Sequence, residues 1–320
     1  MIKPEFESSY CDFCGSLRSC VVLEGPDRLL GLPGWFRVVR CVDCGLLRQD
    51  PRPTAQTMIS YYPPEYEPYS IAIDDEPSFL KKWDRRYGML KRRRAIERYC
   101  SGGRLLDVGC ATGNFMYEMA RSGNWEVEGV EPNAEAARYV QERFGFRVHI
   151  GDLLSVNLPE NYYDVVTMWD VFEHLHYPKA NLETVARILK PGGWFVFSIP
   201  NLRSLDLKLM GKYWIGWELP RHLYYPSMEL MESMLGRFGL YIREWKCLSG
   251  AYVAFLLSLR FWLEDAIGKT FLTRFLISIA GSLIVRTVTS PLFYLITILN
   301  KGSIITGFAQ LQNKIGGHHE

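Results

Sequence analysis

The chain has 320 residues, of which 48% are hydrophobic, and its 37 basic and 35 acidic residues leave a formal net charge of +2. Such a balance argues against a nucleic-acid-binding protein or an acidic tail, and the hydrophobic content suffices for one large domain or two smaller ones. Residues 1–7 lack the apolar core of a signal peptide. We therefore expect a cytoplasmic location, where the eight cysteines are thiols or metal ligands rather than disulfides.

Two Cys-x-x-Cys-Gly motifs come first in the chain, at Cys11/Cys14 and Cys41/Cys44, with 26 residues between them. Two residues between thiolates let both sulfurs reach one ion, and the glycine after each pair permits a tight turn. The pattern predicts a zinc ribbon over residues 1–53 with a closed, structural Zn²⁺ site on which its folding depends; unliganded core cysteines are the alternative. The ribbon's strands are expected at the apolar positions between the motifs: Leu29, Leu30, Trp35, Phe36, Val38 and Val39.

Residues 54–103 connect the ribbon to the rest of the chain. Residues 61–69 hold four tyrosines among prolines, and they are either a linker packed over the following domain or a lid whose hydroxyls line a pocket. Residues 78–99 predict an amphipathic helix with one strongly basic side. That side is either solvated or in contact with an anionic partner such as membrane headgroups or a substrate phosphate. We do not expect nucleic acid, because no stacking platform accompanies the charge.

A strand, a glycine turn and a helix follow at residues 104–121. The apolar run 105–108 contains Asp107, and Gly109 and Gly113 precede the helix. This geometry directs backbone N–H groups and a helix N-terminus toward a bound ligand, and glycines permit its close approach. Glu131 ends the next predicted strand about twenty residues later, where nucleotide folds place a ribose ligand.

Residues 104–200 resemble the class I S-adenosylmethionine-dependent methyltransferases. The resemblance implies that the turn residues and Asp107 lie against the methionine part of the cofactor. It implies that Glu131 binds the ribose and that Asp152 reaches the adenine amine. Ala111 departs from the family pattern, which often has glycine there. The cofactor-binding residues implied in this way are Asp107, Gly109, Cys110, Ala111, Gly113, Glu131, Pro132, Asp152, Leu153, Trp169 and Asp170.

The fold expected for residues 104–320 is a doubly wound, Rossmann-like α/β domain with a mostly parallel seven-stranded sheet. Strands alternate with helices, which implies right-handed crossovers and a ligand crevice at the carboxyl ends of the strands. The first five strands are predicted at 104–108, 125–130, 146–150, 163–169 and 193–199, and the helices between them at 113–122, 133–144 and 179–190.

Two histidines are candidates for a catalytic role. His174, next to Glu173, follows the fourth strand, where related small-molecule methyltransferases often carry a glutamate–histidine pair; otherwise it caps a helix or supports the loop. His222 lies in an acceptor cap predicted over residues 201–226, in a Pro-Arg-His-Leu segment that resembles methyltransferases of bacterial polysaccharide clusters. Arg221 is expected to hold an acceptor phosphate or carboxylate, or else to pin a structural turn. A base is needed only if the methylated atom must lose a proton.

The C-terminal part contains an apolar helical insertion, predicted at residues 251–300, between a sixth strand at 241–247 and a seventh at 303–309. A helix at 227–237 precedes the sixth strand. The apolar runs of the insertion are too short to span a bilayer, which needs about 20 residues. They suit core helices, a homodimer interface or helices lying in the membrane surface, and we favour membrane contact.

Taken together, the sequence predicts a methyltransferase that uses S-adenosylmethionine and carries a structural Zn²⁺. The combination of ribbon and fold resembles bacterial sugar C-methyltransferases, which implies a small-molecule acceptor such as a sugar or glycolipid precursor of polysaccharide biosynthesis. The apolar insertion suggests a lipophilic acceptor such as a quinone as the alternative. A second alternative is a non-catalytic, methyltransferase-like adaptor that binds partners through the ribbon and the C-terminal region.

Overall fold

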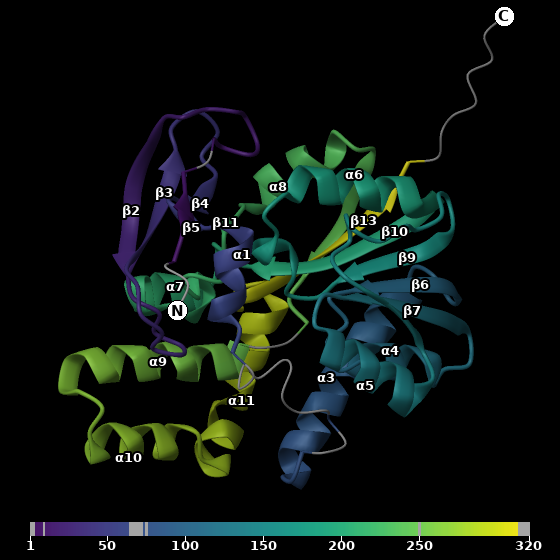
Figure 1. The fold of residues 1–320 in the computed structure, drawn as a ribbon. Helices are drawn as coiled ribbons and strands as arrows, with labels where there is room; N and C mark the ends of the chain where they lie inside the picture. The colour runs from purple at the N-terminus through teal and green to yellow at the C-terminus, as the bar shows by residue number, and fades with distance from the viewer. Residues whose placement is uncertain (1–3, 9, 64–72, 74–75, 249–250, 313–320) are drawn as a thin grey trace, which may run out of the picture.

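The structure is a computed structural model that describes residues 4–8, 10–63, 73, 76–248 and 251–312. Its largest element is a seven-stranded sheet with the order β12-β13-β10-β9-β6-β7-β8 (Figure 1). The strands are β6 (Gly103–Val108), β7 (Trp125–Glu131), β8 (Arg147–Ile150), β9 (Tyr163–Met168), β10 (Leu189–Pro200), β12 (Leu240–Lys246) and β13 (Ile304–Leu311). All pairs are parallel except those of β13, which is antiparallel to both neighbours. The predicted mostly parallel sheet is confirmed.

Helices cover both faces of this sheet. Figure 1 shows α6 and α8 on one face and α3, α4 and α5 on the other. Adjacent residues of β6 accordingly serve two separate cores: Leu106 packs in one hydrophobic cluster and Leu105 in the other, because successive strand side chains point to opposite faces. The helices are α3 (Phe79–Glu97), α4 (Asn114–Ala120), α5 (Ala134–Phe144), α6 (Pro178–Ile188) and α8 (Met228–Gly236).

The N-terminal part forms a second, antiparallel sheet with the order β11-β4-β3-β2, and β1 pairs with β5 beside it. Its elements are β1 (Phe6–Glu7), β2 (Ser19–Gly25), β3 (Phe36–Cys41), β4 (Leu47–Gln49), β5 (Arg52–Pro53) and β11 (Tyr224–Tyr225). The sequence-based strand assignment was wrong for Leu29 and Leu30, which lie in a turn. The Asp27 carboxylate accepts both of their backbone N–H groups and so forms that turn. The assignment also missed β2.

The two sheets are joined by residues of the predicted cap. β11 comes from the cap yet pairs with β4 of the N-terminal sheet, and the backbone N–H of Gln49 donates to the carbonyl of Leu223 at 2.9 Å. Arg52 donates to the Tyr224 hydroxyl in the same region. The short connecting elements are α1 (Ala55–Met58), η1 (Ile59–Tyr61), η3 (Phe172–His174), α7 (Leu205–Met210), η4 (Gly211–Tyr213) and η5 (Ile215–Trp217).

The residues between β12 and β13 form helices, as predicted: α9 (Ala251–Ile267), α10 (Phe271–Ala280) and α11 (Leu283–Ile298). Figure 1 shows α10 at the lower left, away from the seven-stranded sheet. No single helix of the described chain is long and apolar enough to cross a membrane, whereas α10 and α11 together pass that test of length and composition as a pair bent by 57°.

Candidate functional site

The turn between β6 and α4 is shaped by two glycines with left-handed backbone conformations. Gly109 has φ +73°, and a Cβ there would lie 2.5 Å from a methyl group of Val171. Gly113 has φ +71°, and a Cβ there would meet a methyl of Val140 at 2.9 Å. A side chain at either position would therefore force the turn away from its neighbours. Cys110 is buried in the same turn.

Glu131 fastens this turn to the end of β7. Its side chain is 1% exposed, and its two carboxylate oxygens accept the backbone N–H groups of Ala111 and Asn133, each at 2.8 Å. Burial raises the pKa of Glu131, while the two hydrogen bonds favour its charged form. Each oxygen keeps a second lone pair for a ligand. Pro132, which follows it, is exposed.

Ala111 adopts φ +45°, a conformation in which its methyl group is unfavourable and a glycine is not. Ala111 is visible in the sequence as a departure from a family glycine, but its backbone angle is not. Because the Ala111 N–H is bonded to Glu131, the strained conformation is held by a buried acceptor. This hydrogen bond therefore fixes the conformation of the turn.

Asp107 lies near the end of β6, just before this turn, and is 3% exposed. It accepts a hydrogen bond from the Thr167 hydroxyl at 2.6 Å. Burial raises its pKa to about 7, although the Thr167 bond and the charge of Arg92 oppose the shift. An ordinary aspartate has a pKa near 3.9, so the ionisation of this carboxyl near neutral pH depends on whether a cation lies beside it.

Trp169 and Asp170 follow β9, close to Arg92 of α3. Arg92 donates to an Asp170 carboxylate oxygen at 3.2 Å, and its guanidinium lies 4.5 Å from the centre of the Trp169 ring. The Ser198 hydroxyl donates to the other Asp170 oxygen at 2.7 Å. Sequence reasoning placed Trp169 and Asp170 here but missed Arg92 and Ser198. At least this one member of the basic helix contacts the site rather than solvent.

Asp152 and Leu153 lie in the loop after β8. Leu153 is buried, whereas Asp152 is exposed. One Asp152 carboxylate oxygen accepts the N–H groups of Leu154 and Ser155 at 3.0 and 2.8 Å. Asp152 therefore shapes its own loop and keeps a second oxygen for a ligand.

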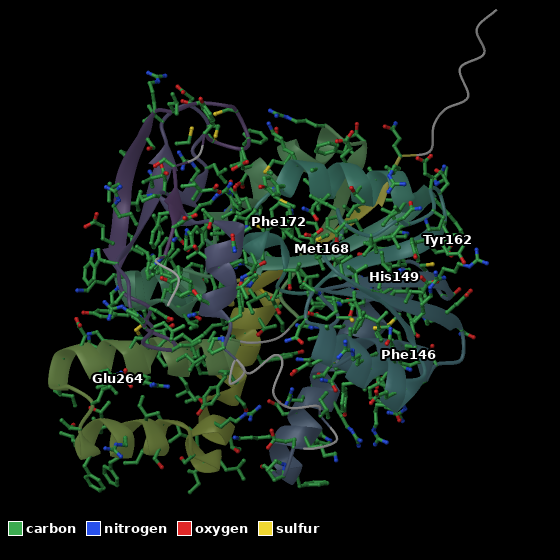
Figure 2. All side chains as sticks on the ribbon, in the orientation of Figure 1. Phe146, His149, Tyr162, Met168, Phe172 and Glu264 are labelled. Carbon is green, nitrogen blue, oxygen red and sulfur yellow. The ribbon has the colours of Figure 1, made fainter. Side chains whose placement is uncertain are left out.

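His174 and His222 come from distant parts of the sequence and lie against each other. Their ring centres are 4.7 Å apart and nearly perpendicular. Burial lowers the pKa of His174 to about 3 and that of His222 to about 4, so both imidazoles are neutral at physiological pH. Figure 2 labels Met168 and Phe172, which mark the end of β9 and the start of the loop that carries His174.

Three further side chains surround the histidine pair, and sequence reasoning did not bring them together. The Nε2 atom of His222 lies 3.9 Å from a carboxylate oxygen of Glu173 and 3.6 Å from one of Glu218. The Tyr62 hydroxyl lies 2.8 Å from Nδ1 of His174. The contact of Tyr62 with His174 agrees with both the packed linker and the lid, while the tyrosines at 66 and 69 lie outside the described residues.

Arg221 is not available to an acceptor, which corrects the expectation that it holds a phosphate or carboxylate. It is fully buried and donates two hydrogen bonds to Asp27, at 2.9 and 2.7 Å. It also donates to Glu218 at 3.0 Å. The alternative expectation, a structural turn pinned by Arg221, agrees with these contacts.

The four motif cysteines converge at one end of the N-terminal sheet. The sulfurs of Cys11 and Cys44 are 3.4 Å apart, those of Cys14 and Cys41 are 3.5 Å apart, and all four lie within 4.8 Å of one another. A tetrahedron of Zn–S bonds of about 2.3 Å has sulfur–sulfur edges of roughly 3.8 Å. This four-cysteine cluster therefore has the donor type, number and spacing that fit a Zn²⁺ ion.

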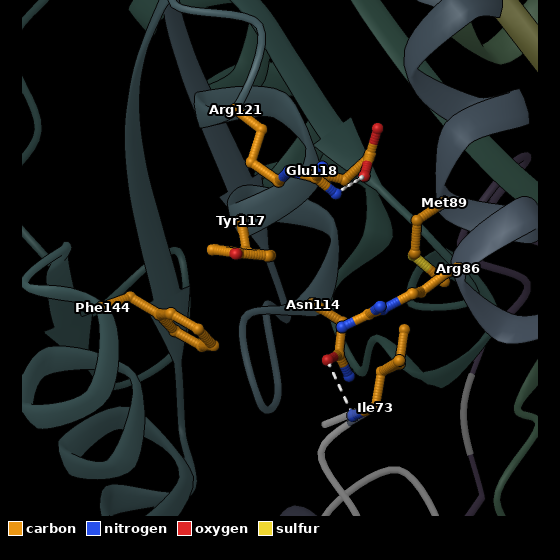
Figure 3. A pocket seen from close by; sticks show the side chains of 8 residues that line it. All are labelled: Ile73, Arg86, Met89, Asn114, Tyr117, Glu118, Arg121 and Phe144. Atoms are coloured by element: carbon orange, nitrogen blue, oxygen red, sulfur yellow. Dashed lines mark hydrogen bonds and ion pairs between the residues drawn. The ribbon is translucent and has the colours of Figure 1, made fainter. Parts of the chain in front are cut away.

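A surface hollow lies on the outer side of α4, between α3 and Phe144 (Figure 3). The backbone N–H of Ile73 donates to the Asn114 side chain at its edge, at 3.1 Å. The residues that line it are Ile73, Arg86, Met89, Asn114, Tyr117, Glu118, Arg121 and Phe144. None of them is a predicted cofactor residue, so this hollow is distinct from the predicted cofactor site at Asp107 and Glu131.

Comparison with known proteins gives a family match over residues 81–244, just over half of the chain, to a model described as "Methyltransferase domain". The chain is 29% identical over 157 residues to a ubiquinone biosynthesis O-methyltransferase of Nitrosospira multiformis, a match that covers 45% of this chain and 65% of the relative. It is 31% identical over 148 residues to the Burkholderia vietnamiensis protein of the same name, covering 44% and 63%. The chain thus spans slightly less than two thirds of these relatives.

A solved structure of a putative sarcosine dimethylglycine methyltransferase from Galdieria sulphuraria is also similar. The match covers 77% of this chain and 92% of that one, with a TM-score of 0.49 and 13% identity.

Proposed function

This chain belongs to the methyltransferase domain family, and from that premise we propose that it transfers a methyl group from S-adenosylmethionine to a hydroxyl of a lipophilic small molecule such as a quinol. The observation that carries the cofactor assignment is the fixed turn between β6 and α4, with Glu131 holding the Ala111 N–H at 2.8 Å. Buried acids on both sides of this turn suit a ligand that carries an amino group and a sulfonium, and they would repel a pyrophosphate.

The residues that would hold the cofactor have separate tasks. Asp107 would bind the amino group of its methionine part, and Glu131 would accept the ribose hydroxyls through its remaining lone pairs. Asp152 would accept the adenine amine through the oxygen that its own loop leaves open. The cofactor supplies an electrophilic methyl carbon, and the protein contributes mainly by holding the acceptor in line with it.

The acceptor is proposed to lie between the Asp170 loop and the histidine pair. The Asp170 loop and His174 follow the carboxyl end of β9, and His222 of the cap lies against His174. Ligands of an open α/β sheet bind at this end of the strands. His174 and His222 would then contact the acceptor hydroxyl or its activating group. Tyr62, bonded to His174, would close over the acceptor and exclude water.

Two observations favour a lipophilic acceptor. Two relatives that are about 30% identical to this chain are named ubiquinone biosynthesis O-methyltransferases. In addition, α10 and α11 each bury a single side chain, Thr273 and Ile296, and expose large apolar ones. Large apolar side chains that are exposed together on neighbouring helices mark an interaction site. We propose that it contacts the membrane in which a lipophilic acceptor would reside, with Arg274 and Lys269 toward anionic headgroups.

A sugar or glycolipid precursor is the alternative acceptor, because the ribbon followed by this fold resembles sugar methyltransferases. The four-cysteine cluster is proposed to hold a structural Zn²⁺, with all four thiolates as ligands and no coordination position left for chemistry.

The test begins with calorimetric titration of the purified protein with S-adenosylmethionine and S-adenosylhomocysteine. Micromolar binding is expected. Methyl transfer from isotopically labelled cofactor is then measured with a detergent-solubilised quinol, a catechol and nucleotide sugars. Transfer to the quinol or catechol supports the proposal, and transfer to nucleotide sugars alone supports the other acceptor. No cofactor binding by folded, zinc-loaded protein would favour the non-catalytic adaptor.

A further inference from the structure

We infer that Glu173, His174 and His222 form a second metal site, which binds a divalent first-row transition ion beside the proposed acceptor. One ligand atom from each of the first three residues lies within 4.8 Å of the other two. The four-cysteine cluster belongs to the other sheet and consists of thiolates, so the two sites differ in place and in ligand chemistry. Only the purpose of this ion, not its binding, rests on the proposed function.

Hydrogen bonds fix which nitrogen of each histidine is left for an ion. Nδ1 of His174 lies 3.0 Å from the carbonyl oxygen of Arg221, and Nδ1 of His222 lies 2.9 Å from that of Gly216. A carbonyl only accepts, so each Nδ1 carries the proton; on His174 this N–H is shared between the carbonyl and the Tyr62 hydroxyl, which lies 2.8 Å from the same nitrogen. Each Nε2 is then left with a bare lone pair. This arrangement, a backbone carbonyl on one nitrogen and a metal on the other, is how proteins orient histidine ligands.

Glu173 supplies an independent indication of a missing partner. It is 2% exposed, and its Oε2 atom has no hydrogen-bond partner among the described residues. A buried, unpaired carboxylate is costly unless a proton or a cation satisfies it. Its other oxygen, Oε1, is 3.9 Å from Nε2 of His222. An ion between the Glu173 carboxylate and this nitrogen would compensate the buried charge and bind the nitrogen lone pair.

Glu218, which lies beside this cluster, has an unusual backbone conformation. It adopts φ +29°, an unfavourable conformation for a residue other than glycine, and such strain concentrates at functional sites. That conformation, together with the Arg221 bond to Oε1, leaves Oε2 3.6 Å from Nε2 of His222. The strained turn therefore places a second carboxylate beside His222, where it adds negative charge that favours a bound cation.

The ligand set indicates the kind of ion. Two imidazoles with one carboxylate suit Zn²⁺, Mn²⁺ or Fe²⁺, whereas Mg²⁺ and Ca²⁺ prefer oxygen ligands throughout. Three protein ligands leave a position open, as in catalytic rather than structural sites. An ion there would lower the pKa of an acceptor hydroxyl and so favour its nucleophilic form near neutral pH.

The experiment measures Mn²⁺ binding by electron paramagnetic resonance of the free ion, on full-length protein treated with a mild chelator. Mn²⁺ competes poorly for thiolates, so it reports the second site while Zn²⁺ stays in the first. Elemental analysis gives the zinc content of each sample. We expect one saturable Mn²⁺ per chain in the wild type and at least tenfold weaker binding in Glu173→Gln and His222→Ala. His176→Gln, in the same loop but outside the cluster, should bind as the wild type does.

Two readouts separate the possible failures. Each variant is melted with and without Mn²⁺, because a ligand that binds the folded state raises Tm; a folded variant whose Tm no longer responds supports the inference. Each is also titrated with S-adenosylmethionine. Absence of saturable Mn²⁺ binding in the wild type, or unchanged binding in both cluster variants, overturns the metal site even if the cofactor binds. If the wild type binds Mn²⁺ but does not bind S-adenosylmethionine, the proposed function is refuted and the metal site is retained.

Discussion

Arg221 and Asp27 form a two-point ion pair across 194 residues of sequence, with both side chains 0% exposed. Asp27 belongs to the turn after β2 in the N-terminal sheet, and Arg221 belongs to the cap that also carries Glu218 and His222. The pair therefore connects the predicted zinc ribbon to the cap residues that surround the histidine pair.

Removal of one member of this pair should destabilise the protein strongly. Asp27→Ala leaves Arg221 buried with only part of its charge compensated, and breaking a buried pair in this way costs about 3–5 kcal/mol. Denaturant unfolding measures the loss. The double variant Asp27→Leu/Arg221→Met should recover much of it, because the uncompensated charge is gone; a double variant as unstable as the single one would contradict this account.

Replacement of Ala111 by glycine should raise the free energy of unfolding or leave it unchanged. Glycine removes about 1–2 kcal/mol of left-handed strain at φ +45°, and it costs about 0.4–1 kcal/mol through the entropy of the unfolded chain. The matched control is Ala186→Gly in the interior of α6, which should cost about 1 kcal/mol. Equal losses at both sites in chemical unfolding would show that the turn is unstrained.

Cofactor affinity should fall as the pH falls below neutrality. The raised pKa of Asp107, about 7, means that this carboxyl is mostly protonated at pH 6 and mostly ionised at pH 7.5. Binding of a cationic amino group needs the ionised form, so the affinity should drop by up to about tenfold over that interval. Thr167, Arg92 and Glu131 are the groups that influence this pKa.

Calorimetry at a series of pH values measures the effect, with Asp107→Asn as the control. The asparagine variant should bind more weakly and should lose this pH dependence. A wild type whose affinity is constant from pH 6 to pH 7.5 would rule out Asp107 as the partner of the amino group.

Loss of the zinc should unfold the N-terminal sheet. Cys41→Ser removes one of four thiolates, and folding of a small metal module depends on its ion. Elemental analysis should find less than one zinc per chain, and hydrogen exchange should show lost protection in β3, β4 and β11. Cys20→Ser, on exposed β2 and outside the cluster, should keep both zinc and protection. A protected, zinc-free Cys41→Ser sheet would refute a structural metal.

The exposed face of α10 and α11 should mediate binding to anionic vesicles. The triple variant Phe271→Asp/Ile284→Asp/Val288→Asp changes side chains that are 74–81% exposed, so it should reduce co-sedimentation without lowering Tm. Ile59→Asp, similarly exposed on η1, should bind as the wild type does. Analytical ultracentrifugation measures the oligomeric state of both proteins. A dimeric wild type and a monomeric triple variant would contradict membrane contact and make this face a subunit interface.

The sequence by itself determined the features that depend on neighbouring residues. The apolar run, Asp107 and the two glycines specify a strand–turn–helix unit through local conformational preference. The alternation of most strands with helices then predicts a mostly parallel sheet, which the structure confirms. The spacing of the cysteine pairs is equally local, since two residues between thiolates set how far apart their sulfurs can be.

Tertiary packing decided how distant residues combine. It buried Arg221 against Asp27 rather than leaving it for an acceptor, and it placed His222 on His174 with Glu173 and Glu218 around them. It also added β11 to a sheet formed by residues almost two hundred positions earlier. These contacts depend on how the cap and the ribbon dock, and no local pattern encodes a docking. Ala111 shows the same limit: its identity is visible in the sequence, but its φ of +45° follows from the hydrogen bond to a glutamate twenty residues away.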